Sequence, residues 1–150
     1  MSAGSVFVDT NILVYAYDLS AGDKHEIAKK EIGALWDSGQ GLISTQILQE
    51  LYVTLTKKVP KPISPDLAKL TIQDLLQWKV IINDGSSILE AIEIQRKHRF
   101  GFWDALVVQA AVKGGAAVLL SEDFEPGRWV DGLTIRNPFI GSKAGNQDLG

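Results

Sequence analysis

Four acidic residues stand where the surrounding sequence is apolar, and together they could bind a metal ion. They are Asp9, Glu50, Asp104 and Asp123. Carboxylates held within a few ångströms of one another repel, and their pKa values rise, unless cations neutralise them. Oxygen ligands without cysteine or histidine select hard ions such as Mg²⁺ or Mn²⁺. Such ions commonly bind substrate phosphates, so this set of residues favours hydrolysis of a phosphodiester by a metal-activated water.

Each acid also has an ordinary structural explanation when it is taken alone. Asp9 and Asp123 follow apolar runs and could simply cap helices. Asp104 has apolar neighbours three and four positions later, and it could be a first-turn acid favoured by the helix dipole. Glu50 could be a boundary residue with a packed stem and a hydrated head. We expect a shared site because the ends of parallel strands meet at one edge of a sheet, where ligands usually bind.

The sequence between the acids predicts a three-layer α/β/α domain. Apolar runs predict strands at residues 6–8, 42–44, 80–82, 117–120 and 133–135. Apolar residues at helical spacing predict helices at residues 11–17, 23–36, 45–57, 64–78, 87–94 and 102–113. Strands that alternate with helices form mainly parallel sheets, so we expect a central, mainly parallel sheet of four to five strands. The last helix is almost entirely apolar and should be deeply buried.

Three helix starts are predicted from their capping residues. Asp23 with Glu26, and Ser87 with Glu90, have the spacing of a capping box. Ser64 precedes a proline, which is favoured at the first position of a helix. Ser64 is therefore predicted to be an N-cap.

Length and composition favour one domain in a reducing compartment. The chain has 150 residues, no cysteine and two separated histidines. This composition excludes a disulfide framework and disfavours a zinc site. There is no signal-peptide pattern and no apolar run near about 18 residues, so we expect a cytoplasmic protein without a membrane partner. We expect the domain to cover residues 1–140 and the polar segment 141–150 to be a mobile tail.

The charge pattern leaves room for a nucleic-acid partner. The net charge is −3, but it becomes +1 when the four acids above are set aside as metal ligands. The first candidates for phosphate contacts precede the helix of Asp104, and they are Arg96, Lys97 and Arg99. A weaker set follows the helix of Glu50 and comprises Lys57, Lys58 and Lys61. Basic residues at helix ends are also commonly solvated, and this explanation stays open.

The four tryptophans have two explanations. Trp36, Trp78 and Trp129 could stack on bases, although a tryptophan at helical spacing more often packs in the core. Trp103, beside Asp104, is assigned to the core.

Motifs around the four acids resemble those of a known family. They are Phe7-Val8-Asp9-Thr10-Asn11-Ile12-Leu13, Gln49-Glu50-Leu51, Phe102-Trp103-Asp104-Ala105, Leu119-Leu120-Ser121-Glu122-Asp123-Phe124, Gly132-Leu133 and Asn137-Pro138-Phe139. As a set they resemble the PIN-domain ribonucleases, particularly the VapC-type toxins of bacterial toxin–antitoxin pairs. The resemblance runs from about Val6 to Phe139 and implies a parallel sheet with a central first strand.

The resemblance also implies an activity and an ion. The protein would be an endoribonuclease that depends on Mg²⁺ or Mn²⁺, with the four acids as its catalytic and metal-binding residues. Asp9, Asp104 and Asp123 would bind the ion directly. Glu50 would bind it or orient a water.

Polar neighbours of the acids and several partners follow from the same resemblance. Asn11 and Ser121 would hold the carboxylates or a phosphate oxygen, and Thr10 is a weaker candidate for that role. The expected partners are an RNA substrate, a small antitoxin protein that lies across the groove, and a second copy of the chain in a homodimer.

Other interpretations stay open at this point. A non-catalytic PIN-fold binding or scaffold domain, or a housekeeping PIN nuclease, would share the pattern. A haloacid-type phosphatase would need a second aspartate where Asn11 stands, and a receiver domain would need a lysine where Ser121 stands. Neither histidine lies beside a nucleophile in a strand-turn-helix elbow, so a hydrolase triad lacks support.

Overall fold

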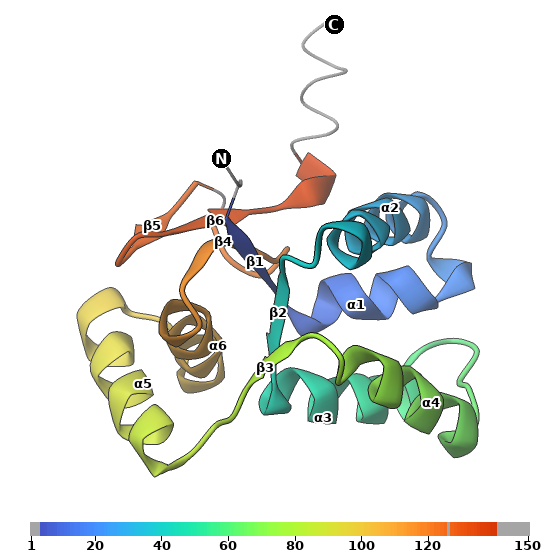
Figure 1. The fold of residues 1–150 in the computed structure, drawn as a ribbon, viewed down its shortest axis with the longest axis horizontal. Coiled ribbons are helices and arrows are strands. Elements are labelled where there is room, and N and C mark those ends of the chain that lie inside the picture. Colours follow the sequence, from blue (N-terminus) through green and yellow to red (C-terminus); the bar gives the residue numbers. More distant parts are fainter. Residues whose placement is uncertain (1–3, 126, 141–150) are drawn as a thin grey trace, which may run out of the picture.

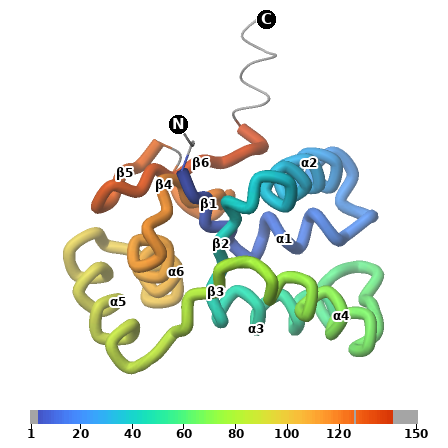
Figure 2. Tube along the Cα trace, viewed as in Figure 1, coloured from blue at the N-terminus to red at the C-terminus, as the bar shows by residue number. Residues whose placement is uncertain are grey.

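One six-stranded sheet lies at the centre of the computed structural model, which describes residues 4–125 and 127–140. The strands are β1 (Ser5–Val8), β2 (Gly41–Ser44), β3 (Lys79–Ile81), β4 (Ala116–Leu120), β5 (Trp129–Val130) and β6 (Leu133–Arg136). Their order is β3-β2-β1-β4-β6-β5, and only β5 and β6 pair in the antiparallel direction. The first strand is therefore central, between β2 and β4, as the blue segment of Figure 2 shows.

Helices cover both faces of this sheet, which confirms the predicted α/β/α architecture. They are α1 (Thr10–Tyr17), α2 (Asp23–Ser38), α3 (Thr45–Val53), α4 (Pro65–Leu75), α5 (Gly85–His98) and α6 (Phe102–Lys113). Helices α1 to α4 lie on one side of the sheet, and α5 and α6 lie on the other (Figure 1). A short 3-10 turn, η1 (Leu19–Ala21), follows α1. The predicted helix at 45–57 is α3 continued by a π-helical turn, η2 (Thr54–Lys58).

The chain order of the strands creates a switch point beside β1. From β1 the chain builds outward through β2 and β3, and it then returns to place β4 on the other side of β1. Ligands of open α/β sheets bind at the carboxyl ends of strands where the order reverses in this way. Asp9 directly follows β1, and Ser121 to Asp123 directly follow β4. The topology therefore brings these two predicted strand ends together.

The sixth strand, β5, exceeds the predicted number of four to five. It has only two residues and pairs with β6 through a tight turn, with Val130 opposite Leu133. The turn residues Asp131 and Gly132 have φ angles of 48° and 86°. Positive φ at both central positions suits the primed turns of hairpins, for which Asp-Gly is a strong signal. That dipeptide could have predicted the hairpin, although a two-residue strand has no readable periodicity.

The core continues from the sheet into α6. Phe7 and Val8 of β1 have no exposed surface, and every residue from Ala105 to Ala111 of α6 is buried. This confirms the prediction of a deeply buried helix. The first turn of α6, which carries Asp104, is thus anchored by the core behind it.

Two predicted capping boxes are wrong, and one predicted cap is confirmed. Helix α2 begins at Asp23 itself, after Gly22, so Asp23 is a first-turn acid that favours the helix dipole. Helix α5 begins after Asp84, whose carboxylate accepts from the N–H of Ser87 at 3.0 Å, while the Ser87 hydroxyl accepts from the N–H of Asp84 at 3.1 Å. Ser64 does cap α4.

The C-terminal segment and the membrane prediction complete the comparison with the sequence. The predicted mobile tail, residues 141–150, lies outside the described residues, and the domain limit at residue 140 stays a prediction. Within residues 4–125 and 127–140, no helix has both the length and the apolar character that crossing a bilayer requires.

Close packing at Gly41 of β2 generates a stability prediction. A Cβ atom at Gly41 would lie 2.5–2.8 Å from ring atoms of Trp78. We expect Gly41→Ala to lower the free energy of unfolding by about 1–3 kcal/mol, because the ring must move. Gly33→Ala is the matched control, since nothing lies within 4 Å of its Cβ on α2, and it should gain about 0.5–1 kcal/mol. Urea denaturation measures both, and equal effects would contradict this packing.

Candidate functional site

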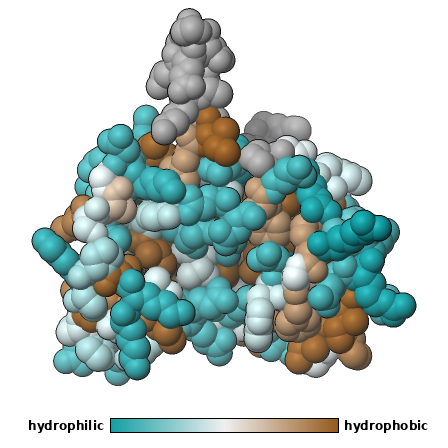
Figure 3. All heavy atoms as spheres, turned by 180° about the vertical axis from the view of Figure 1, so that it is seen from behind, coloured by the Kyte–Doolittle hydropathy of each residue, from teal (hydrophilic) through white to brown (hydrophobic). Residues whose placement is uncertain are grey.

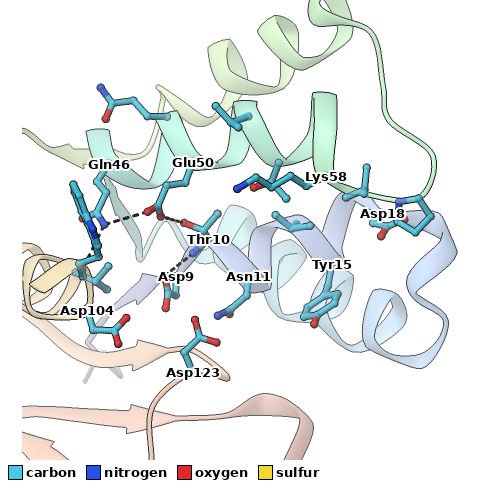
Figure 4. A pocket seen from close by; sticks show the side chains of 18 residues that line it. Asp9, Thr10, Asn11, Tyr15, Asp18, Gln46, Glu50, Lys58, Asp104 and Asp123 are labelled. Carbon is cyan, nitrogen blue, oxygen red and sulfur yellow. Dashed lines mark hydrogen bonds between the residues drawn. The ribbon is translucent and has the colours of Figure 1, made fainter. Parts of the chain in front are cut away.

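All four predicted acids line one pocket, with a volume of about 700 Å³ (Figure 4). They come from four different elements. Asp9 is the N-cap of α1, Glu50 lies in α3, Asp104 lies in the first turn of α6, and Asp123 follows β4. Figure 4 shows the carboxylates of Asp9, Asp104 and Asp123 around a common space. Asp9 therefore both caps α1 and lines the shared pocket.

Asp9 is the most buried of the acids, with 5% of its surface exposed. One carboxylate oxygen accepts from the N–H of Thr10 at 2.8 Å, and the other accepts from the Ser121 hydroxyl at 2.7 Å. Ser121 has no exposed surface, and its hydroxyl also accepts from the N–H of Asp123 at 3.1 Å. Ser121 thus connects two acids that lie far apart in the sequence.

Glu50 is held by neighbours on both sides. Its Oε1 accepts from the Thr10 hydroxyl at 2.6 Å, and its Oε2 accepts from the Gln46 amide at 3.3 Å. The same amide nitrogen of Gln46 contacts the carbonyl oxygen of Trp103 at 3.4 Å. Thr10, the weaker candidate in sequence, therefore orients a carboxylate, and Gln46 joins α3 to the start of α6. Gln46 went unpredicted, although it lies one helical turn before Glu50.

Asn11 lies on the pocket wall, and only one of the two polar atoms of its amide has a hydrogen-bond partner among the described residues. Its Oδ1 accepts from the N–H of Glu122 at 3.4 Å. Its Nδ2 is buried and has no hydrogen-bond partner within the described part of the chain. In Figure 4 this nitrogen points toward the space beside Asp123. Asn11 could therefore donate to a carboxylate or to a bound oxygen ligand.

A second set of contacts fixes the segment that carries Asp123. The Tyr15 hydroxyl donates to Glu122 at 2.6 Å, and the Lys24 ammonium pairs with the same carboxylate at 2.7 Å. Burial, followed by the hydrogen bond to Glu122, raises the pKa of Tyr15. These contacts fasten the loop after β4 to α1 and α2. They went unpredicted because nothing in the sequence pairs residues of α1 with the residue before Asp123.

The charges of Glu50 and Asp123 act on both Asp9 and Asp104. Burial raises the pKa of Asp9 to about 7, and the charges of Asp123 and Glu50 act in the same direction, against the hydrogen bonds from Ser121 and Thr10. Burial and the same two charges also raise the pKa of Asp104. The pocket is therefore unfavourable for several ionised carboxylates at once, and a cation there would be stabilising.

The donor set fits a hard divalent cation bound through a few carboxylates. Every acidic group in the pocket offers oxygen, and no histidine lines it. Within residues 4–125 and 127–140, no three His, Cys, Asp or Glu side chains form a ready metal-binding group. Mg²⁺ typically keeps several waters and uses only one or two protein carboxylates. An open arrangement of acids is compatible with that mode of binding.

The basic run before α6 lies apart from the pocket wall. Arg96, Lys97 and Arg99 are not among the residues that line the pocket, and Lys97 lines a separate cavity. Arg96 forms an ion pair with Glu93 at 3.6 Å. The pocket is instead lined by Lys58, from the set that the sequence ranked lower. Contact of the run with RNA stays a prediction.

One tryptophan, Trp103, does not lie where the sequence predicted it. Trp103 is 66% exposed and lines the pocket, so its assignment to the core is wrong. It lies in the first turn of α6, before the buried run Ala105 to Ala111, where the helix borders the pocket. Trp36 and Trp78 pack against each other with ring centroids 5.5 Å apart, and neither lines the pocket.

A family model and several solved structures match the chain. The PIN domain model matches residues 6–128. The chain belongs to the PIN domain family. No protein with a curated description matches its sequence.

Three solved structures share the fold of this PIN domain. VapC20 of Mycobacterium tuberculosis, a toxin that cleaves the Sarcin-Ricin loop, is 20% identical, with a TM-score of 0.63 over 85% of this chain and 98% of that one. A toxin–antitoxin complex from Klebsiella pneumoniae is 20% identical, with a TM-score of 0.65 over 89% and 98%. DNA-bound VapBC from Salmonella typhimurium is 16% identical, with a TM-score of 0.64 over 90% and 98%.

The raised pKa of Asp9 makes the stability of this PIN domain depend on pH. In metal-free buffer, stability should fall as the pH rises from about 4 to about 7, because the folded state holds a proton that the unfolded chain releases near its ordinary pKa of 3.8. Asp9→Asn should make this slope shallower, with a remainder from the raised pKa of Asp104, and it should be more stable than the wild type at pH 7 by up to about 4 kcal/mol. Urea denaturation at several pH values measures it.

The control for this experiment is Asp37→Asn, which removes a negative charge from an exposed position on α2. Its pH profile should follow that of the wild type. An Asp9→Asn profile that also follows the wild type would contradict the raised pKa.

Proposed function

We propose that this PIN domain is an endoribonuclease that depends on Mg²⁺ or Mn²⁺, and that it is the toxin of a toxin–antitoxin pair. The observation that carries the proposal is the meeting of Asp9, Glu50, Asp104 and Asp123 in one pocket at the switch point of the sheet. Carboxylates whose charges raise the pKa values of Asp9 and Asp104 suit a cation, and hard divalent cations suit phosphate chemistry.

In the proposed site, Asp9, Asp104 and Asp123 hold the ion, and Glu50 binds it or orients the attacking water. When bound, the ion lowers the pKa of that water and neutralises the charge of the phosphate oxygens. Thr10 and Gln46 fix the carboxylate of Glu50 through their hydrogen bonds.

The polar neighbours have distinct proposed roles. Ser121 keeps Asp9 in place by donating to its carboxylate, and it receives the N–H of Asp123. Asn11 has a buried amide nitrogen without a partner among the described residues, and we assign it to a phosphate oxygen or to Asp123. Such supporting contacts commonly change metal affinity or activity by about 10- to 100-fold when they are lost.

The structural relatives support the toxin assignment. The fold is that of a loop-cleaving toxin and of proteins found in toxin–antitoxin complexes. We propose RNA as the substrate, an antitoxin protein as the inhibitor and the cytoplasm as the place of action.

Exposed apolar side chains offer surfaces for protein partners. Leu67 and Leu70 of α4, and Ile88 and Leu89 of α5, are exposed. In Figure 3 hydrophobic atoms gather at the lower right, where α5 lies. Large patches of exposed apolar side chains commonly mark protein interfaces. We propose that the antitoxin and a second copy of the chain, in a homodimer, cover such surfaces.

The nuclease proposal predicts a metal-dependent activity that the acids control. The wild type should cleave RNA with Mn²⁺ or Mg²⁺ and should be inactive with EDTA. Asp9→Asn and Asp104→Asn should each lower the rate by about 100-fold or more, because both remove a ligand charge. Asp37→Asn should cleave like the wild type. Gel analysis of a labelled RNA measures the rates, and cleavage that survives EDTA would overturn the metal proposal.

The toxin proposal predicts an effect on growth. Expression of the wild type in a bacterial host should arrest growth, Asp37→Asn should do the same, and Asp104→Asn should relieve the arrest. A housekeeping nuclease would cleave RNA in vitro without arresting growth, and a scaffold domain would do neither. Growth curves after induction, with protein levels matched by blotting, separate these three outcomes.

A further inference from the structure

The π-helical turn after α3 places one lysine on the pocket wall. The turn η2 spans Thr54–Lys58, and the N–H of Val59 donates to the carbonyl oxygen of Thr54, five residues earlier, at 3.2 Å. Leu55 and Val59 are buried and anchor the turn. Of the lysines in this region, Lys58 lines the pocket, whereas Lys57 and Lys61 do not. Single π-helical turns are frequent at functional sites because they re-aim side chains.

Among the described residues, Lys58 is the only cationic side chain on the wall of this pocket, which also contains the four acids and Asp18. The ion pairs found within the described residues do not involve Lys58, so its charge is not used by a carboxylate there. Lysine is a flexible point charge that suits phosphate groups. An ammonium in this position is available to a phosphate of a bound strand.

Trp103 marks the opposite end of the same wall. The amide of Gln46, near the start of α3, contacts the carbonyl oxygen of Trp103, whereas Lys58 follows the end of α3. Glu50 lies between them on this helix, and Figure 4 shows Gln46, Glu50 and Lys58 in that order. An exposed indole next to Asp104 in sequence and an ammonium that extends toward Glu50 therefore both line the pocket of the acids, one from α6 and one from η2.

We propose that Trp103 and Lys58 position the substrate strand, with a base stacked on Trp103 and a phosphate held by Lys58. This inference rests on the proposed nuclease function and names two side chains that would hold its substrate. Stacking requires a base whose face is free, which single strands and loops provide and which a duplex does not. The two contacts position the strand so that the phosphate between them lies at the acids.

RNA binding tests the proposal without relying on catalysis. Asp9→Asn serves as a background variant with little or no cleavage. Fluorescence anisotropy measures the affinity of this variant for a short labelled RNA without secondary structure. The same RNA in a duplex is the comparison. The unpaired RNA should bind more tightly. Adding Trp103→Ala should weaken binding of the unpaired strand by about 5- to 100-fold, the range for losing one base–aromatic stack.

Adding Lys58→Ala should weaken binding and also change its salt dependence. The slope of log affinity against log salt should become shallower by about 0.7, because one phosphate contact to a single strand is lost. Lys58→Arg should restore most of the affinity. Trp103→Ala should leave the slope unchanged, because stacking releases no counterions.

Two variants serve as matched controls. Lys57→Ala removes the neighbouring exposed lysine, and Trp129→Ala removes a tryptophan that is 65% exposed, and neither residue lines the pocket. Both should bind RNA like the background, and circular dichroism confirms that all variants fold. The proposal is overturned if Lys58→Ala equals Lys57→Ala, if Trp103→Ala equals Trp129→Ala, or if duplex binds as well as single strand. If wild-type protein neither binds nor cleaves RNA, the nuclease function itself fails.

Discussion

The repulsion among carboxylates around a buried aspartate is the constraint on which this structure depends. Asp9 has lost nearly all contact with water, and the charges of Glu50 and Asp123 oppose its ionisation further, so its pKa rises to about 7. A buried charge without compensation is costly. The chain offsets part of that cost with hydrogen bonds from Thr10 and Ser121, and the proposed cation would offset the rest.

The topology produces this crowding. Strands β1 and β4 are parallel neighbours although more than a hundred residues separate them, and the buried helix α6 leads directly into β4. Asp9 and Asp123 therefore follow adjacent strand ends, and Asp104 is held over them by a helix that cannot move without disturbing the core. The hydroxyl of Ser121 then joins the two strand ends through one atom.

The parts predicted correctly from sequence are those that follow from burial and chain order. Uninterrupted apolar runs predicted the parallel strands, and their carboxyl ends predicted where Asp9 and Asp123 meet. The misses concern local geometry with no periodic signal, such as the two-residue strand β5, the π-helical turn at Lys58 and the cap supplied by Asp84. Trp103 was misplaced because the residues that follow it are buried, although its own place in the first turn of α6 exposes it at the pocket.

Isothermal titration with Mn²⁺ at pH 7, in buffers with different ionisation enthalpies, measures whether a cation binds among the acids and displaces a proton. A cation that binds among these acids must displace the proton that Asp9 retains. We expect saturable binding that releases on the order of half a proton per ion, because the pKa of Asp9 is about 7. The absence of binding, or binding whose heat is the same in every buffer, would contradict it.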